Sequence, residues 1–327
     1  MGEGCLVALR LVKAVRRAVI DVGTNSIKLL VADVAGREVR PVHEESRQTR
    51  LGKGFYATHQ LQPEAVAHTA AVVWEFAEIA REKNADSLHV IATSAARDAV
   101  NPGDLTTAIQ RASDLKVEII SGEREAELVF QGVCTDPELA KQHLLLLDVG
   151  GGSTEFILGH GQHQHFARSF PLGTVRLLEK FPHGDPPTRA QFTLCRDWIL
   201  HFLRSEVRPK LEPALQRETK RDSETGGIQL VGTGGTTSIL ARMEKKLDRF
   251  DRERIESTVL SREQITAHRK YLWSLPLAQR KEIPGLPRLR ADVILTGVLI
   301  YEAMMEEFEF KQLRVSTRGL RFAAVMD

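Results

Sequence analysis

The sequence predicts an α/β fold made of two related domains that face a central cleft. The stretch DVGTNS at Asp21–Ser26 returns as DVGGGS at Asp148–Ser153. Each copy lies between two apolar runs, so each predicts a strand, a tight turn and a second strand. Short apolar strands and segments of helical periodicity follow both copies. The chain has 327 residues, enough for two domains. We interpret the pattern as an internal duplication whose two turns point into one cleft.

The first domain is expected over residues 17–136, after an N-terminal extension over residues 1–16. Arg17–Val34 predicts the strand–turn–strand unit, and Gln62–Lys83 predicts a helix because its apolar residues recur near the helical period. The other expected elements are a strand at Val39–Ser46, a strand at Leu88–Thr93, a helix at Leu105–Ala112, a strand at Lys116–Ser121 and a helix that runs from Gly122 through Val133.

The second domain is expected over residues 137–327, after a linker turn at TDPELAKQ. Leu144–Val149 and Thr154–Leu158 predict the repeated strand–turn–strand unit. The other expected elements are a long helix at Arg189–Leu211, a polar loop at Lys220–Gly227, a strand at Ile228–Val231, helices at Ser238–Leu247, Arg262–Leu275 and Ala291–Phe308, a strand at Leu313–Val315 and a terminal helix.

The composition is typical of a soluble globular protein, with 42% apolar and 27% charged residues. A net charge of +2 gives no strong field that would attract nucleic acid or a membrane surface. Three cysteines without paired spacing argue against a disulfide framework or a zinc site. No run reaches the roughly 18 apolar residues of a membrane span. We therefore expect a cytoplasmic protein that binds neither nucleic acid nor membrane.

The repeated turn has the residue types of a phosphate site. Glycines in a tight turn let successive backbone N–H groups point inward and bind an anion. Asp21 and Asp148 end apolar strands at the turns, where an ionised carboxylate is costly without a partner, and a divalent cation is a natural one. The alternative is a pair of glycine β-turns with capping aspartates. Two copies in equivalent places favour the phosphate interpretation.

A third glycine-rich stretch, GTGGTT at Gly232–Thr237, follows a predicted strand and opens a predicted helix. That placement suits an anion at a helix N-terminus. The stretch lacks the lysine of a P-loop and the spacing of a dinucleotide fingerprint. A plain glycine-rich turn between strand and helix stays open as the alternative.

Several blocks in a fixed order carry a family resemblance: AVIDVGTNSIKLLVADV, ATSAARDAVN, ISGEREAELVFQGV, LLDVGGGSTEFILG, PLGTVRLLEKF, GTGGTTSILA and RADVILTGVLI. The chain resembles the exopolyphosphatase / guanosine pentaphosphate phosphohydrolase family, within the actin-like ATPase superfamily, from about Val19 onward. The resemblance implies two actin-like (ribonuclease H-like) domains in the short form of the family, without a further helical domain. Thr24 stands where the family often has serine, and both residues supply a hydroxyl.

The resemblance also implies roles for individual residues. Glu125, in SGEREA, is expected to be the general base, and Arg97 to neutralise charge on the transferred phosphoryl group. Glu155 is expected to act with Asp148 and Asp21 in holding a metal ion. The expected phosphate-binding residues are Gly23, Thr24, Asn25, Ser26, Gly150, Gly151, Gly152, Ser153, Thr154, Gly234, Gly235 and Thr236.

The implied activity is release of a terminal phosphate from inorganic polyphosphate or from pppGpp, with Mg²⁺ or Mn²⁺ as cofactor. The implied ligands are polyphosphate or a guanosine penta- or tetraphosphate, and a homodimer is compatible with the family. An actin-like kinase or ATPase and a sensor that binds without hydrolysis are the alternatives. The glutamate in SGEREA favours the hydrolase, because attack by water needs a proton acceptor.

Two other segments have alternative interpretations. GHGQHQHF contains His160, His163 and His165, which could bind a metal, although a polar hairpin tip is favoured. YEAMMEEFEF at Tyr301–Phe310 could be a partner-binding helix, although a buried helix with one solvent-exposed face is favoured.

Overall fold

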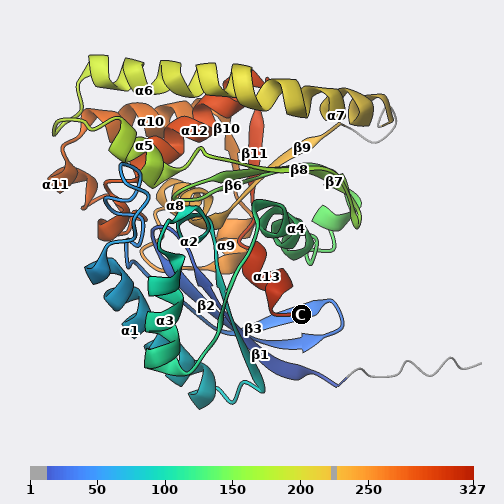
Figure 1. Cartoon of the computed structure of the whole chain (residues 1–327). Coiled ribbons are helices and arrows are strands. Elements are labelled where there is room, and N and C mark those ends of the chain that lie inside the picture. The colour runs from blue at the N-terminus through green and yellow to red at the C-terminus, as the bar shows by residue number, and fades with distance from the viewer. Residues whose placement is uncertain (1–12, 222–226) are drawn as a thin grey trace, which may run out of the picture.

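The computed structural model describes residues 13–221 and 227–327. Two β-sheets lie one above the other, each with helices on its outer side (Figure 1). Most of the expected N-terminal extension, and the centre of the expected polar loop Lys220–Gly227, lie outside the described residues. Val15 and Arg16, which were assigned to the extension, already belong to the first strand.

The first sheet has the strand order β3-β2-β1-β4-β5. Its members are β1 Val15–Val22, β2 Ile27–Ala35, β3 Glu38–Arg47, β4 Ser87–Ala92 and β5 Val117–Ile119. The first three strands form an antiparallel meander, and β4 and β5 add to β1 in parallel. The helices of this half are α1 Pro63–Glu82, the short α2 Ser94–Asp98 and α3 Pro102–Ser113. The predicted strands and helices of this half are all present.

The second sheet repeats this arrangement. Its order is β10-β11-β9-β6-β7-β8, in which β6, β7 and β8 form the meander and β9 and β11 add in parallel. The strands are β6 His143–Val149, β7 Thr154–His160, β8 His163–Phe170, β9 Gln229–Thr233, β10 Val259–Ser261 and β11 Gln312–Val315. The shared topology confirms that the two halves are related.

The helices of the second half surround this sheet, and the longest of them lie above it (Figure 1). They are α5 Thr174–Lys180, α6 Arg189–Phe202, α7 Arg208–Arg221, α8 Gly234–Lys245, α9 Arg252–Glu256, α10 Arg262–Ser274, α11 Leu277–Arg280 and α12 Ile294–Glu307. The predicted long helix contains a π turn at Leu203–Val207 and then continues past Leu211 to Arg221 as α7. Pro209 follows this turn and has no N–H to donate to the helical ladder. The α12 helix is buried on nearly all sides, because only Glu306 is exposed.

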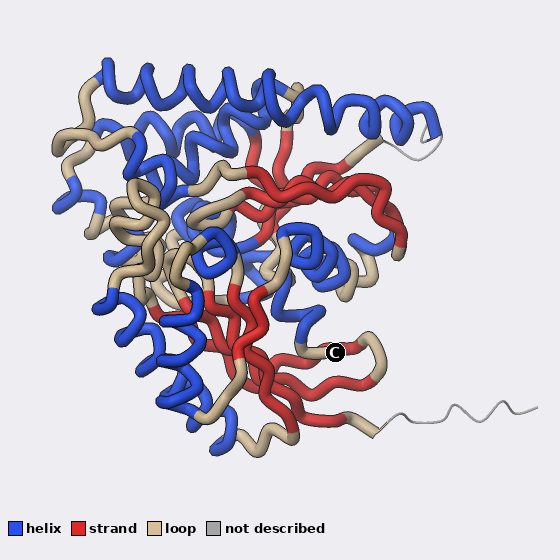
Figure 2. Tube along the Cα trace, viewed as in Figure 1, coloured by secondary structure: helices blue, strands red, loops and turns tan. Residues whose placement is uncertain are grey.

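Two helices lie between the sheets and join the domains. They are α4 Gly122–Val133 and α13 Leu320–Ala324, which sit side by side between the two sets of strands (Figure 2). One hydrophobic cluster combines Val19 of the first sheet, Leu146 of the second, Phe130 of α4 and Phe322 of α13. The end of the chain therefore returns to the first half, and the two domains share one core.

No helix in the described part of the chain is both long enough and apolar enough to cross a bilayer. The largely buried α12 packs on α10, α5, α6 and α8 of the second half.

The contact between α4 and α13 predicts the effect of one substitution. A Cβ on Gly132 would lie 2.0 Å from the carbonyl oxygen of Gly319, so Gly132→Ala should separate the two helices and lower the free energy of unfolding by about 1–3 kcal/mol. Gly103→Ala is the matched control, because no atom lies within 4 Å of its added Cβ and alanine favours the helix. Urea unfolding measures both. Equal stability of the two variants would show that the helices can separate without cost.

Candidate active site

The two repeated turns have the same hydrogen bond and meet across the interface between the domains. The Gly23 amide donates to the Ser26 carbonyl at 3.1 Å, and the Gly150 amide donates to the Ser153 carbonyl at 2.9 Å. A Cβ on Gly151 would lie 2.9 Å from Cβ of Thr24. Only glycine allows the backbones to approach this closely. The expected cleft between the two turns is therefore present in the fold.

The turns enclose a cavity of about 60 Å³, which has room for only a few water molecules. Most of the predicted site residues line it: Asp21, Gly23, Thr24, Asn25, Ser26, Glu125, Asp148, Gly150, Gly151, Gly152, Ser153, Glu155, Gly235 and Thr236. The lining residues that sequence reasoning did not assign to the site are Lys28, Thr93, Ser94, Val149, Arg290 and Leu320. Segments from both domains thus form one cavity.

Three predicted residues do not line this cavity. The Thr154 side chain is buried and donates to the Leu172 carbonyl, so its hydroxyl serves the fold. Gly234 lies behind Asp148: its φ is +83°, and a Cβ there would stand 2.1 Å from Oδ1 of that carboxylate. Arg97 lines a neighbouring cavity and reaches the site through Glu125.

Glu125 is positioned by the first turn of α4. The hydroxyl oxygen of Ser121 caps the helix by accepting from the Arg124 amide at 3.1 Å. The next residue, Glu125, is buried, and one terminal nitrogen of Arg97 donates to its Oε2 at 2.8 Å. Burial raises the pKa of Glu125 to about 7, although the Arg97 guanidinium opposes that shift. A carboxyl with a pKa near neutrality can accept a proton at physiological pH.

Two further buried carboxyls belong to the second turn. Burial raises the pKa of Asp148 and raises that of Glu155 well above its usual range, and the neighbouring carboxylates act in the same direction. The Ser169 hydroxyl donates to Oε1 of Glu155 at 2.7 Å. In the first turn, Asp21 lies 3.7 Å from the Lys28 ammonium. Closely spaced acids of this kind favour a cation among them.

Other groups at the site favour an anion. The guanidinium of Arg290 donates to the Ser26 hydroxyl at 2.8 Å, and burial lowers its pKa to about 10. Among the described residues, Nδ2 of Asn25 and Oγ of Ser94 are buried without a hydrogen-bond partner. Buried donors without a partner are costly, and a phosphate oxygen would satisfy them. The site therefore offers acids for a cation and donors for an oxyanion.

A larger basic pocket of about 580 Å³ adjoins the cavity through Lys28, Gly235 and Arg290. Its other charged or titratable lining residues are Arg47, His68, Arg242 and Arg321, and no acid lines it among the described residues. Sequence reasoning missed this pocket because its basic residues come from β2, β3, α1, α8 and the C-terminal region, and no single segment shows the cluster.

Histidines do not form a metal site here. The GHGQHQHF segment is the β7–β8 hairpin, as favoured, and His160 stacks on His143 with ring centroids 4.2 Å apart. In the described part of the chain, no group of three or more His, Cys, Asp or Glu residues is arranged to hold a metal ion by itself. A metal at the active site would therefore share its ligands with water and substrate.

Two meanders that carry facing glycine turns, joined by shared interdomain helices, define the actin-like ATPase fold. The sequence matches the Ppx/GppA phosphatase family over residues 30–326, and the chain belongs to this family.

Individual relatives agree with this assignment. Exopolyphosphatase 2 of Mycobacterium tuberculosis is 34% identical, with 93% of this chain and 96% of that protein aligned. The crystal structure of an exopolyphosphatase from Cytophaga hutchinsonii superimposes with a TM-score of 0.80 at 28% identity, covering 94% of this chain and 96% of that one. The Ppx/GppA enzyme of Aquifex aeolicus superimposes with a TM-score of 0.74 at 28% identity, covering 96% and 99%.

The buried carboxyls predict how stability depends on pH. Because the pKa of Glu125 is raised from 4.5 to about 7, the folded state binds more protons than the unfolded state between these values. Stability from this group is present at low pH and is lost as pH rises through 7, by about 3 kcal/mol. Glu125→Gln removes the titration, so its stability relative to wild type should rise between pH 4.5 and 8. Urea unfolding across that range tests this, and parallel curves would refute it.

Proposed function

We propose that the protein is an exopolyphosphatase, which uses water to release the terminal phosphate from inorganic polyphosphate. The observation that carries this proposal is the placement of Glu125, a carboxyl with a pKa near 7 beside Arg97 in a cavity closed by two facing anion-binding turns. The names of the relatives support the substrate, since several of them are exopolyphosphatases. The basic pocket beside the cavity offers a place for the rest of an anionic chain.

The reaction that these groups support is an in-line displacement by water. Amides and hydroxyls of the two turns, with Asn25 and Ser94, would hold the oxygens of the terminal phosphate. Glu125 would accept a proton from the attacking water, and Arg97 would keep its carboxylate oriented and partly charged. Lys28 and Arg290, which line both the cavity and the basic pocket, would stabilise the charge that develops on the leaving chain. Positioning and charge neutralisation suffice for phosphoryl transfer to water.

We further propose that Mg²⁺ or Mn²⁺ binds with the substrate. Asp148 and Glu155 are cross-strand partners in the β6–β7 pair, and burial, together with the neighbouring carboxylates, raises the pKa of both. Magnesium commonly takes one or two protein carboxylates, substrate phosphates and water. This agrees with a site whose described residues cannot hold a metal alone. When bound, the ion would neutralise phosphate oxygens and polarise the phosphorus for attack.

The second candidate substrate is pppGpp. One observation favours it: Phe250 and Leu289 line the basic pocket and are 51% and 59% exposed. An exposed aromatic ring beside arginines suits a nucleobase, which can stack on it. Phosphate release from long polyphosphate and from pppGpp, measured under the same conditions, ranks the two substrates. Phe250→Ala should then impair only pppGpp turnover if the base stacks there.

A kinase or ATPase and a non-hydrolytic sensor stay as alternatives with less support. A kinase has less support because the relatives with a stated activity include Exopolyphosphatase 2 and Exopolyphosphatase 1 of Mycobacterium tuberculosis, which are phosphohydrolases by name. A sensor would not need a buried carboxyl with a pKa near neutrality beside an arginine.

Replacement of the base tests the mechanism. Glu125→Gln keeps the shape of the side chain but removes the proton acceptor, so kcat on long polyphosphate should fall by about 10²–10⁴-fold while KM changes little. Glu127→Gln is the matched control, since Glu127 lies one half-turn along α4 and pairs with Arg124 at 2.8 Å. Phosphate release at saturating substrate measures both. If Glu125→Gln works as fast as Glu127→Gln, then Glu125 is not the base.

Removal of a carboxylate tests the metal. Phosphate release should stop in excess EDTA and return with Mg²⁺ or Mn²⁺. Asp148→Asn should raise the metal concentration needed for half-maximal activity by roughly tenfold or more, the loss common for changes around metal sites. Asp104→Asn, in the first turn of α3, is the control. Full activity in EDTA, or an unchanged metal requirement in Asp148→Asn, would contradict the proposal.

A further inference from the structure

A separate cavity of about 250 Å³ lies on the Glu125 side of the active site. Ser153 lines both cavities, and Arg97, which donates to Glu125 at 2.8 Å, lines the outer one. The hydroxyl of Ser169, another lining residue, donates to Glu155. The outer cavity is thus one side chain away from the proposed point of attack.

Three arginines, Arg97, Arg168 and Arg176, line this outer cavity together with two acids, Asp98 and Glu123. Arg176 uses Nε for the Gly152 carbonyl and one terminal nitrogen for Asp98, at 2.8 and 3.0 Å. Arg168 makes one ion pair at 3.5 Å, to the exposed Glu123. A guanidinium has five N–H donors, so these contacts leave donors on each arginine for a further anion. Both acids are paired with these arginines, and three arginines against two acids leave the cavity with an excess of positive charge. That charge, with the hydroxyls of Ser153 and Ser169 in a space of this volume, suits a hydrated phosphate ion.

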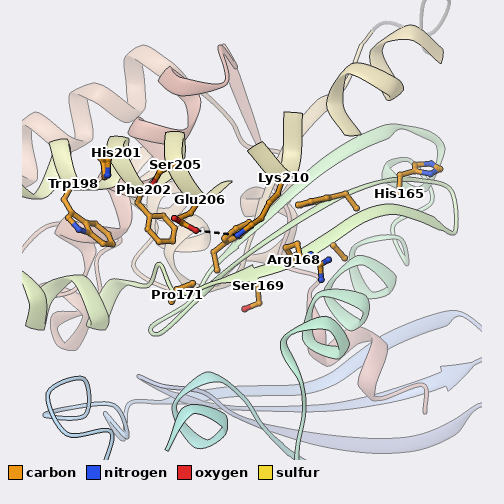
Figure 3. A pocket seen from close by; sticks show the side chains of 13 residues that line it. His165, Arg168, Ser169, Pro171, Trp198, His201, Phe202, Ser205, Glu206 and Lys210 are labelled. Atoms are coloured by element: carbon orange, nitrogen blue, oxygen red, sulfur yellow. Dashed lines mark ion pairs between the residues drawn. The ribbon is translucent and has the colours of Figure 1, made fainter. Parts of the chain in front are cut away.

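The outer cavity leads to the surface. Arg168, Ser169, Phe170 and Pro171 line both it and a groove of about 1150 Å³ between β8 and the α6–α7 helical stretch. Figure 3 shows this groove, with Arg168 and Ser169 on β8, Pro171 just after it, and Lys210 on the facing helix, paired with Glu206 at 3.6 Å. A small anion that leaves the outer cavity therefore enters a wide opening that also carries positive charge.

The basic pocket that adjoins Lys28 and Arg290 is separate from this route. The two pockets share no lining residue, and each meets the catalytic cavity through different groups. In-line displacement places the attacking water and the leaving chain on opposite sides of the phosphorus. With the proton acceptor on the Arg97 side, the chain belongs on the Lys28 side, and the released phosphate is left on the Arg97 side.

We propose that the cavity of Arg97, Arg168 and Arg176 is an orthophosphate site, through which the product leaves while the shortened chain stays in the basic pocket. This inference rests on the proposed function. It explains why two separate pockets with basic residues adjoin the active site. It would also let several terminal phosphates be removed from one bound chain.

The test is the inhibition pattern of added inorganic orthophosphate against long polyphosphate. If product and chain occupy different pockets, both bind at once and the inhibition is noncompetitive or mixed. Arg168→Gln should raise the inhibition constant for orthophosphate by roughly threefold to tenfold, as expected for one lost contact in a half-open pocket. Arg47→Gln, in the basic pocket, should instead raise KM for polyphosphate. Arg111→Gln, exposed on α3, should change neither.

Purely competitive inhibition of the wild-type protein, or an orthophosphate inhibition constant that Arg168→Gln leaves unchanged, would overturn the product site. Absence of any phosphate release by wild type would instead contradict the proposed function. In that case, equilibrium dialysis of radiolabelled orthophosphate still decides the inference: weaker binding by Arg168→Gln than by Arg111→Gln supports the site, and equal binding refutes it.

Discussion

The packing of α4 between the two sheets is the constraint on which the active site depends. Its apolar face, with Val129 and Phe130, shares one core with strands of both domains and with α13. Ser121 caps the start of the same helix, and this start places Glu125 at the point where the two glycine turns meet. Any change in the angle between the domains must therefore move Glu125 relative to at least one turn. Under the proposed function, the domains would separate to let a phosphate chain enter, because the cavity between the turns holds only about 60 Å³.

The ionisation of the carboxyls in the cavity also depends on how closely the two domains pack. Asp21, Glu125, Asp148 and Glu155 converge there, and burial is the main reason that the last three are hard to ionise. An open cleft would hydrate these carboxyls and return their pKa values toward ordinary ones. The pKa of Glu125 is thus set by the interface between domains and not by α4 alone. Under the proposed function, a metal–phosphate complex would supply the charge that this closed cavity lacks.

Much of the fold followed from local patterns. Most strands and the long helices have apolar periodicities that the chain itself displays, so their types were predicted and only their ends moved. Of the elements that were missed, β10 at Val259–Ser261 and α11 at Leu277–Arg280 are too short to show a period. The eight-residue β8 was also missed, because polar residues dominate its first half. The long helix continues past Leu211 with Pro213 inside α7, a continuation that sequence patterns do not indicate because proline normally ends a helix.

The sequence by itself determined the duplicated turns and the acids beside them, because the same aspartate–glycine pattern occurs twice at equivalent strand ends. It also placed Glu125 by its motif. Only the tertiary structure decided that the Thr154 hydroxyl bonds to the Leu172 carbonyl, that Gly234 packs against the Asp148 carboxylate, and that Arg290 donates to Ser26 of the first turn. The direction of a side chain, and which distant cations surround a cavity, depend on how sheets and helices pack. Packing joins residues that are hundreds of positions apart, and no local pattern records that.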